Sequence, residues 1–140
     1  MTERKTFRPD IVVEDETGAP VAIVEVKYKI HDADRSYFYE QLQQFLQQSN
    51  HGGLAPFTII ADRDTIEIFS GIPGRTVPVR LDTSLLSVYD SKYQERSEHV
   101  SYIVRLMELW LDDVAHHWRS NPAPAESQLP PGLAEALRAA

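Results

Sequence analysis

The chain has no cysteine among its 140 residues, so disulfide bonds and thiolate zinc sites are excluded. It has no apolar run near the roughly 20 residues that a membrane-spanning helix needs. The N-terminal sequence MTERKTFRPD also lacks the apolar stretch of a secretory signal. We therefore expect a cytoplasmic protein with no membrane partner. No GxxxxGK[ST] phosphate loop occurs, so the motor of any translocating machine that this chain serves would be another chain.

Positive charge is scarce as well. The chain has 14 lysine and arginine residues against 21 aspartate and glutamate residues, for a formal net charge of −7. Nonspecific affinity for nucleic acid comes mainly from neutralising phosphates, so this balance counts against tight autonomous binding of DNA. Five basic residues nevertheless cluster near the N-terminus, either as a local positive patch or as ordinary solvated strand ends: Arg4, Lys5, Arg8, Lys27 and Lys29.

The most informative segment is 8–29, which reads RPDIVVEDETGAPVAIVEVKYK. Apolar, mostly β-branched stretches at 11–13 and 21–24 flank a polar stretch that ends at Gly18, a residue suited to positive φ. This pattern predicts two antiparallel strands joined by a turn. The second stretch shows no polar alternation, which is typical of a strand covered on both faces.

Charged residues stand at the ends of these two strands. Asp10 follows Pro9 at the start of the first strand, and Glu25 and Lys27 end the second. Because side chains alternate between faces along a strand, Glu25 and Lys27 share one face. Burying a carboxylate without a partner is costly, so a cation or a substrate is expected to satisfy these groups.

The residue types indicate a chemistry. Mg²⁺, or Mn²⁺ in its place, prefers oxygen ligands and is usually held by one or two carboxylates together with substrate phosphate, a role that suits Asp10 and Glu25. Lys27 is suited to orient water for in-line attack on a phosphodiester. The alternative is that Glu-x-Lys lies on the wet face of a strand, where such pairs contribute little. The full ordered string favours metal-dependent phosphodiester hydrolysis.

Pro9-Asp10, Glu25 and Lys27 resemble, in order and spacing, the signature of the PD-(D/E)xK nuclease superfamily. The sequence from RPDIVV to IVEVK is particularly similar to the nuclease domain at the N-terminus of type I restriction enzyme motor subunits. The resemblance implies an α/β fold with a restriction endonuclease-like core, in which a mixed central β-sheet is flanked by helices. It also implies Asp10 and Glu25 as metal ligands, the main-chain carbonyl of Val26 as a further ligand, and Lys27 as the catalytic lysine.

Two other family features bear on the site. Several branches carry a glutamine four residues before an aromatic on the helix after the lysine strand, and Gln41 with Phe45 resembles this element, with phenylalanine in place of the more usual tyrosine. The resemblance thus implies Gln41 as a supporting catalytic residue. Members also usually have a helix before the Pro-Asp strand that often supplies an acid, and Met1 to Arg8 are too few for it. Either the domain is trimmed, a partner supplies the helix, or the site works with fewer ligands.

Hydrophobic periodicity predicts the other elements. These are a helix over 36–48 capped by Asp34 or Ser36, strands over 57–61 and 65–69, a short edge strand near 76–79, and a long C-terminal helix over about 93–119. Residues 120–131 have the composition of a linker, and 133–138 predict a short helix. We therefore expect a nuclease-like domain over 1–119 and a Pro/Ala-rich linker with a helical tail over 120–140.

Two hypotheses from different classes follow. The first is a metal-dependent nuclease, acting on nucleic acid and most readily on DNA, in restriction, defence or mobile-element biology. The second is a noncatalytic module of the same fold that binds nucleic acid or a protein partner. A homodimer, or a separate motor or specificity subunit, would be the natural protein partner. A third reading, a generic α/β domain with a fortuitous motif, predicts that Asp10 and Glu25 lie far apart and that Lys27 faces solvent.

Overall fold

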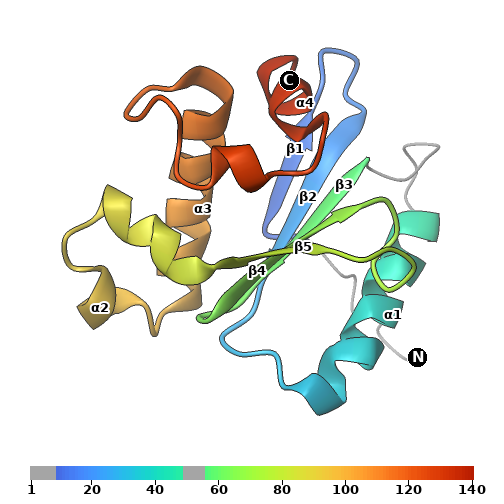
Figure 1. The fold of residues 1–140 in the computed structure, drawn as a ribbon. Helices are drawn as coiled ribbons and strands as arrows, with labels where there is room; N and C mark the ends of the chain where they lie inside the picture. The colour runs from blue at the N-terminus through green and yellow to red at the C-terminus, as the bar shows by residue number, and fades with distance from the viewer. Residues whose placement is uncertain (1–8, 49–55) are drawn as a thin grey trace, which may run out of the picture.

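The computed structural model describes residues 9–48 and 56–140, and Figure 1 shows their arrangement. A five-stranded mixed sheet is flanked by helices, as the sequence predicts for the fold class. The strands are β1 (Ile11–Glu14), β2 (Pro20–Val26), β3 (Phe57–Ala61), β4 (Thr65–Ser70) and β5 (Val79–Asp82). The helices are α1 (Asp32–Gln48), α2 (Tyr93–Arg96), α3 (Val100–His116) and α4 (Leu133–Arg138), with 3-10 turns η1 (Thr83–Tyr89) and η2 (Glu126–Gln128).

The strands lie in the order β1-β2-β3-β4-β5. The pair β2 and β3 is parallel and α1 connects the two, whereas the three other pairs are antiparallel. This is the connection that parallel neighbours require, since a short turn cannot join them. The carboxyl end of β2 and the start of α1 therefore meet at one end of the sheet, where the predicted site residues lie.

The predicted hairpin of β1 and β2 is confirmed. Asp15 closes its turn, because the carboxylate accepts hydrogen bonds from the N–H groups of Thr17 at 2.8 Å and Ala19 at 3.1 Å. Gly18 supplies the positive φ of 84° that a residue with a side chain rarely adopts. The pairing of β1 with β2 shifts register between Val13 and Glu14. From Ala22 to Val26, β2 is buried, as its apolar sequence predicts.

Two apolar layers cover the sheet. On one face α1 packs over β3 and β4 through a cluster formed by Ile30, Phe38, Leu42, Ile60 and Phe69. On the other face α3, α4 and η1 cover a larger core, as Figure 1 shows with α1 on one side of the sheet and α3 with α4 on the other. The helical spacing in α3 is confirmed, because its periodic residues are buried: Ile103, Met107, Trp110 and Val114.

Several predicted boundaries are wrong. Helix α1 begins at Asp32, so Asp34 and Ser36 lie inside it and cannot cap it. The helix expected over 93–119 is split into α2 and α3, because the chain turns between Arg96 and Val100. It ends early at His117, whose left-handed backbone (φ 50°) cannot continue a helix. The edge strand begins at Val79, beyond the proline.

Residues 120–140 pack onto the same core. Leu133 and Leu137 of α4 are buried in the cluster that α3 forms with the sheet. Trp110 donates its indole N–H to the carbonyl of Pro124 at 2.9 Å, and Arg138 donates to the carbonyl of Ala115 at 3.1 Å. The segment expected to be a linker is therefore held to α3 by both apolar contacts and hydrogen bonds, and the short helix expected over 133–138 is confirmed as α4.

Candidate active site

Asp10 lies immediately before β1, where the hairpin ladder stops. The last β1–β2 pair is Ile11 with Val24. Beyond it, the Asp10 carboxylate takes the place of a strand partner and accepts a hydrogen bond from the N–H of Val26 at 2.7 Å. This contact holds Asp10 against the end of β2. The N–H and C=O of one strand residue point to the same side, so the carbonyl of Val26 also faces the Asp10 side of β2.

Glu25 is buried beside Asp10, with only 4% of its surface exposed. Burial, together with the hydrogen bond and negative charge of Asp10, raises the pKa of its carboxyl from 4.5 to about 8, against a smaller lowering by Lys27. One carboxyl oxygen, Oε2, has no hydrogen-bond partner among residues 9–48 and 56–140. A buried oxygen of this kind is costly unless another group satisfies it.

Lys27 lies on the same face as Glu25, as strand alternation predicts. Its Nζ atom is 3.8 Å from Oε1 of Glu25, and its side chain remains 48% exposed. The same ammonium lies 5.5 Å from the centroid of the Phe38 ring of α1. The lysine is thus anchored to the carboxylate on one side and to an aromatic ring on the other, while it keeps access to solvent.

Gln41 comes near Lys27 through a shared pocket. The pocket has a volume of about 410 Å³ and extends from the end of β2 to the first turns of α1; it is lined by Lys27, Tyr28, Lys29, Ile30, His31, Asp34, Tyr37, Phe38 and Gln41. The amide of Gln41 donates a hydrogen bond to the hydroxyl of Tyr37 at 3.2 Å. Gln41 therefore forms part of the pocket wall. Among the described contacts, it has no hydrogen bond to Asp10, Glu25 or Lys27.

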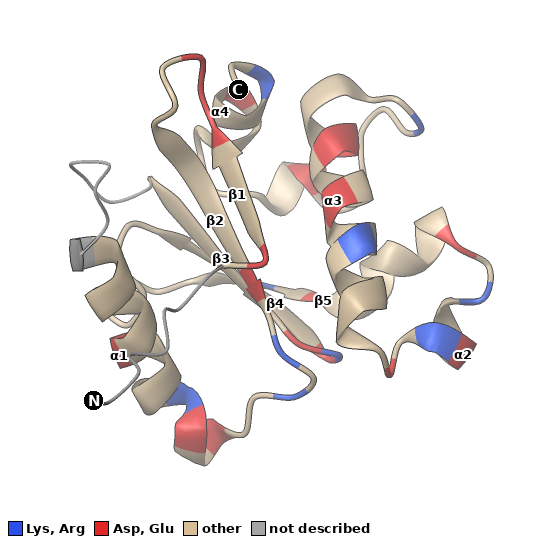
Figure 2. Ribbon diagram, turned by 180° about the vertical axis from the view of Figure 1, so that it is seen from behind, with Lys and Arg blue, Asp and Glu red and all other residues tan. Residues whose placement is uncertain are grey.

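The chain segment that joins β2 to α1 brings basic residues to this end of the sheet, as Figure 2 shows. Lys27 and Lys29 belong to this segment, and Arg63 in the β3–β4 turn reaches it by donating to the hydroxyl of Tyr28 at 2.9 Å. Lys27, Lys29 and Arg63 thus bring positive charge to this end of the sheet, and the local positive patch stays a prediction. Arg4, Lys5 and Arg8, the other predicted members, lie outside the described residues.

The sequence reasoning missed a second buried carboxylate. Glu67 of β4 is 1% exposed and lies in the same row of the sheet as Glu25, with Ile60 between them in register. Arg35 of α1 forms an ion pair with Glu67, Arg80 approaches it at 3.2 Å, and the Tyr39 hydroxyl lies 3.0 Å from each of its oxygens. Glu67 is thus a fully partnered structural carboxylate. No sequence signal separates it from a glutamate on a wet strand face.

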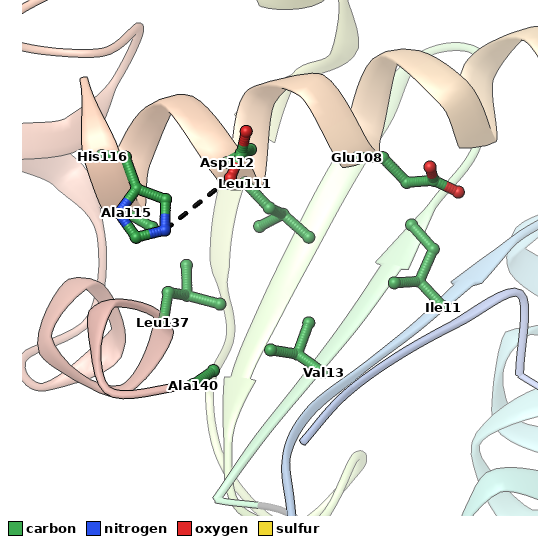
Figure 3. Close-up of a pocket in the computed structure, with 9 residues that line it drawn as sticks. All are labelled: Ile11, Val13, Glu108, Leu111, Asp112, Ala115, His116, Leu137 and Ala140. Carbon is green, nitrogen blue, oxygen red and sulfur yellow. Dashed lines mark ion pairs between the residues drawn. The ribbon is translucent and has the colours of Figure 1, made fainter. Parts of the chain in front are cut away.

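The adjacent histidines at the end of α3 have different partners, because neighbouring residues on a helix point in different directions. His116 lies 3.8 Å from Asp112, and His117 lies 2.6 Å from Glu126 of η2. Figure 3 shows His116 with Asp112 at the rim of a cleft of about 240 Å³, which β1, α3 and α4 enclose. The cleft wall is mostly apolar, and Ile11, Val13 and Leu137 contribute to it. These histidines do not join the Asp10 and Glu25 site.

The fit of the residues to a divalent cation rests on the donors present. Asp10 and Glu25 supply carboxylate oxygens, of which Oε2 of Glu25 is unsatisfied, and Val26 supplies a carbonyl on the same side. These are the hard oxygen donors that Mg²⁺ prefers, and Mg²⁺ commonly keeps waters and substrate oxygens as its remaining ligands. In the part of the chain that the structure describes, histidine, cysteine, aspartate and glutamate nowhere gather in a metal-binding group of three or more. The site therefore offers two carboxylates and one carbonyl.

The protein was compared with family models, curated proteins and solved structures. No family model, no curated protein and no solved structure matches the chain. Within residues 9–48 and 56–140, no helix combines the length and the apolar character that crossing a membrane requires.

Proposed function

We propose that the protein is a metal-dependent nuclease of the PD-(D/E)xK type that hydrolyses phosphodiester bonds of nucleic acid, with DNA as the first substrate to test. The observation that carries this proposal is the meeting of Asp10, Glu25 and Lys27 at the end of β2, with an unsatisfied oxygen on Glu25. The arrangement also counts against a fortuitous motif, which predicts Asp10 and Glu25 far apart. The hairpin, crossover helix and parallel strand formed by β1, β2, α1 and β3 support a restriction endonuclease-like core.

Each residue has a distinct part in this proposal. Asp10, Glu25 and the carbonyl of Val26 would hold Mg²⁺, with Mn²⁺ as a substitute. When bound, the cation would supply positive charge to stabilise the developing charge on the phosphate. The ammonium of Lys27, which is half exposed, is placed to donate a hydrogen bond to the phosphodiester or to orient the attacking water. Gln41 would support the wall on which the substrate rests.

A noncatalytic module of the same fold is the second candidate. The observation that favours it is the small number of ligands, because only two carboxylates meet at the site among the described residues. The two functions differ in their metal requirement. A nuclease binds Mg²⁺ or Mn²⁺ through Asp10 and Glu25, whereas a binding module has no need of either cation.

The deciding experiment measures cleavage of supercoiled, linear and single-stranded DNA, and of RNA, with Mg²⁺ or Mn²⁺. Wild type is compared with Lys27→Ala and Glu25→Gln, and Lys92→Ala and Glu95→Gln serve as matched controls because both residues are exposed around α2 and neither lines the pocket beside Lys27. We expect the two site variants to lose at least about 100-fold in rate, the usual size of a lost catalytic group. The controls should retain full activity.

Two results would contradict the nuclease proposal. If Lys27→Ala and Glu25→Gln cut as fast as wild type, the activity does not come from this site. If folded wild type cuts none of the substrates and titration calorimetry detects no Mn²⁺ binding, the noncatalytic module replaces the nuclease.

A further inference from the structure

The pocket beside Lys27 has features that the nuclease proposal does not use. Its volume of about 410 Å³ falls within the roughly 300–1,000 Å³ of small-ligand sites. Two aromatic side chains in its wall are unusually open, since Tyr37 is 65% exposed and Tyr28 is 47% exposed. Large exposed aromatics that line a pocket indicate a surface prepared for a planar or apolar partner.

Both tyrosines are fixed by their hydroxyl groups. Gln41, one turn along α1, donates to the hydroxyl of Tyr37 at 3.2 Å. Arg63 donates to the hydroxyl of Tyr28 at 2.9 Å, and its guanidinium lies 5.5 Å from the centroid of the same ring. A ring held in this way loses little conformational entropy when a ligand stacks on it, so part of the cost of binding is already met by the fold.

The charge of the pocket wall suits a nucleotide. Lys27 and Lys29 line the pocket together with both rings. Asp34 is the acidic residue in the wall. Cations beside exposed aromatic faces are the combination by which proteins hold single-stranded nucleic acid, with phosphates bound by the cations and bases stacked on the rings.

We propose that this pocket binds one unpaired nucleotide of the substrate, whose base stacks on Tyr37 while Lys29 and Lys27 hold its phosphates. This inference rests on the proposed nuclease function and adds its substrate class, a single strand or a frayed end. Bases inside a duplex are stacked on one another and cannot reach a side chain in a pocket. With a net charge of −7, the chain also has little capacity to bind a duplex through phosphate contacts alone.

The test is binding without cleavage. A fluorescein-labelled DNA single strand of about 10 nucleotides and a blunt duplex of the same sequence are titrated in EDTA, and fluorescence anisotropy gives the Kd of each. We compare wild type with Tyr37→Ala, Tyr37→Leu and Tyr37→Phe. Val77→Ala, at an apolar position that is 93% exposed and outside the pocket, is the control.

We expect a clear ranking of the Kd values for the single strand. Wild type and Val77→Ala should bind the single strand with similar Kd, and Tyr37→Phe should bind it only slightly more weakly, because phenylalanine keeps the stacking ring and loses only the hydroxyl bond to Gln41. Tyr37→Ala and Tyr37→Leu should bind it about 10-fold more weakly, within the range for loss of one base–aromatic stack. Since Tyr37 is mostly exposed, its replacement should leave the unfolding midpoint unchanged, which separates loss of binding from loss of folding.

The outcomes separate this inference from the nuclease function. Equal affinity of wild type for duplex and single strand, no measurable affinity for the single strand, or an unchanged Kd in Tyr37→Ala would overturn the pocket assignment, even if Lys27-dependent cleavage is observed. Single-strand binding that depends on the Tyr37 ring, in a protein that cuts nothing with Mn²⁺, would support the pocket and refute the nuclease.

Discussion

Glu25 makes the stability of the metal-free protein depend on pH in a defined direction. Its carboxyl has a pKa raised to about 8 in the folded chain, against an ordinary value of 4.5. Between these values the folded state keeps a proton that the unfolded state has released. The free energy of unfolding must therefore fall as pH rises through this interval. The contribution is complete below pH 4.5 and is lost above pH 8.

The size of the loss follows from the same interval. At about 1.4 kcal/mol per pKa unit, the change from 4.5 to about 8 limits it to about 5 kcal/mol. Water that enters beside the half-exposed Lys27 side chain will hydrate part of the new charge, so we expect a loss of about 2–4 kcal/mol between pH 5 and pH 9. That is a large fraction of the stability of an ordinary small domain.

The assay is urea unfolding of wild type and Glu25→Gln from pH 5 to pH 9 in EDTA. Glutamine has nearly the same shape and does not titrate, so the difference between the two proteins removes the contributions of all other groups that titrate alike in both. We expect Glu25→Gln to become the more stable protein above pH 8. In a parallel series without EDTA, free Mn²⁺ at 100 times its Kd should restore about 2.7 kcal/mol to wild type at pH 9 and nothing to the variant. A difference that stays constant from pH 5 to pH 9 would refute the reasoning.

Two further predictions concern polar groups on the α1 face of the sheet. Glu67→Ala should lower the free energy of unfolding by about 2–4 kcal/mol, because it leaves Arg35 without its buried partner, and urea unfolding beside an Asp32→Ala control measures this; a loss below about 1 kcal/mol would contradict it. Thr58→Val should raise stability by about 1 kcal/mol, because the buried Thr58 hydroxyl has no partner among the described residues; lower stability than wild type in the thermal melt of the variant would show that the hydroxyl is bonded.

The parts of the fold that the sequence predicts are those set by neighbouring residues. The β1–β2 hairpin can be predicted from residues 8–29 alone, because the alternation of side chains along a strand and the turn glycine are local properties of the sequence. The apolar stripe of α3 is likewise a local period of 3.6 residues. The site geometry at Asp10, Glu25 and Lys27 follows from the hairpin, since register alone brings the ends of the two strands together.

The parts that could not be predicted depend on distant partners. Asp113 lies within α3 and is fully buried, because it accepts hydrogen bonds from the N–H groups of Arg119 and Ser120 and from the hydroxyl of Tyr89. These contacts lower the pKa of its carboxyl despite burial and fold the chain back where α3 ends. Nothing in the periodicity around Asp113 indicates them. The same holds for α4, whose burial depends on α3 and on β2, and β2 lies more than a hundred residues earlier in the chain.

The two buried glutamates of the sheet provide an internal comparison for the site. Glu67 and Glu25 lie in one row, separated only by Ile60, and both are almost completely buried. At Glu67 the fold supplies two guanidinium groups and a phenol, so every carboxylate oxygen is satisfied. At Glu25 it supplies one lysine at 3.8 Å and a second carboxylate, Asp10, whose charge makes ionisation harder. A purely structural glutamate in this row is thus neutralised by arginine, whereas Glu25, counting only residues 9–48 and 56–140, keeps a deficit of positive charge that a divalent cation would fill. Glu25→Arg should therefore disrupt the site, while Mn²⁺ should bind wild type and leave the environment of Glu67 unchanged.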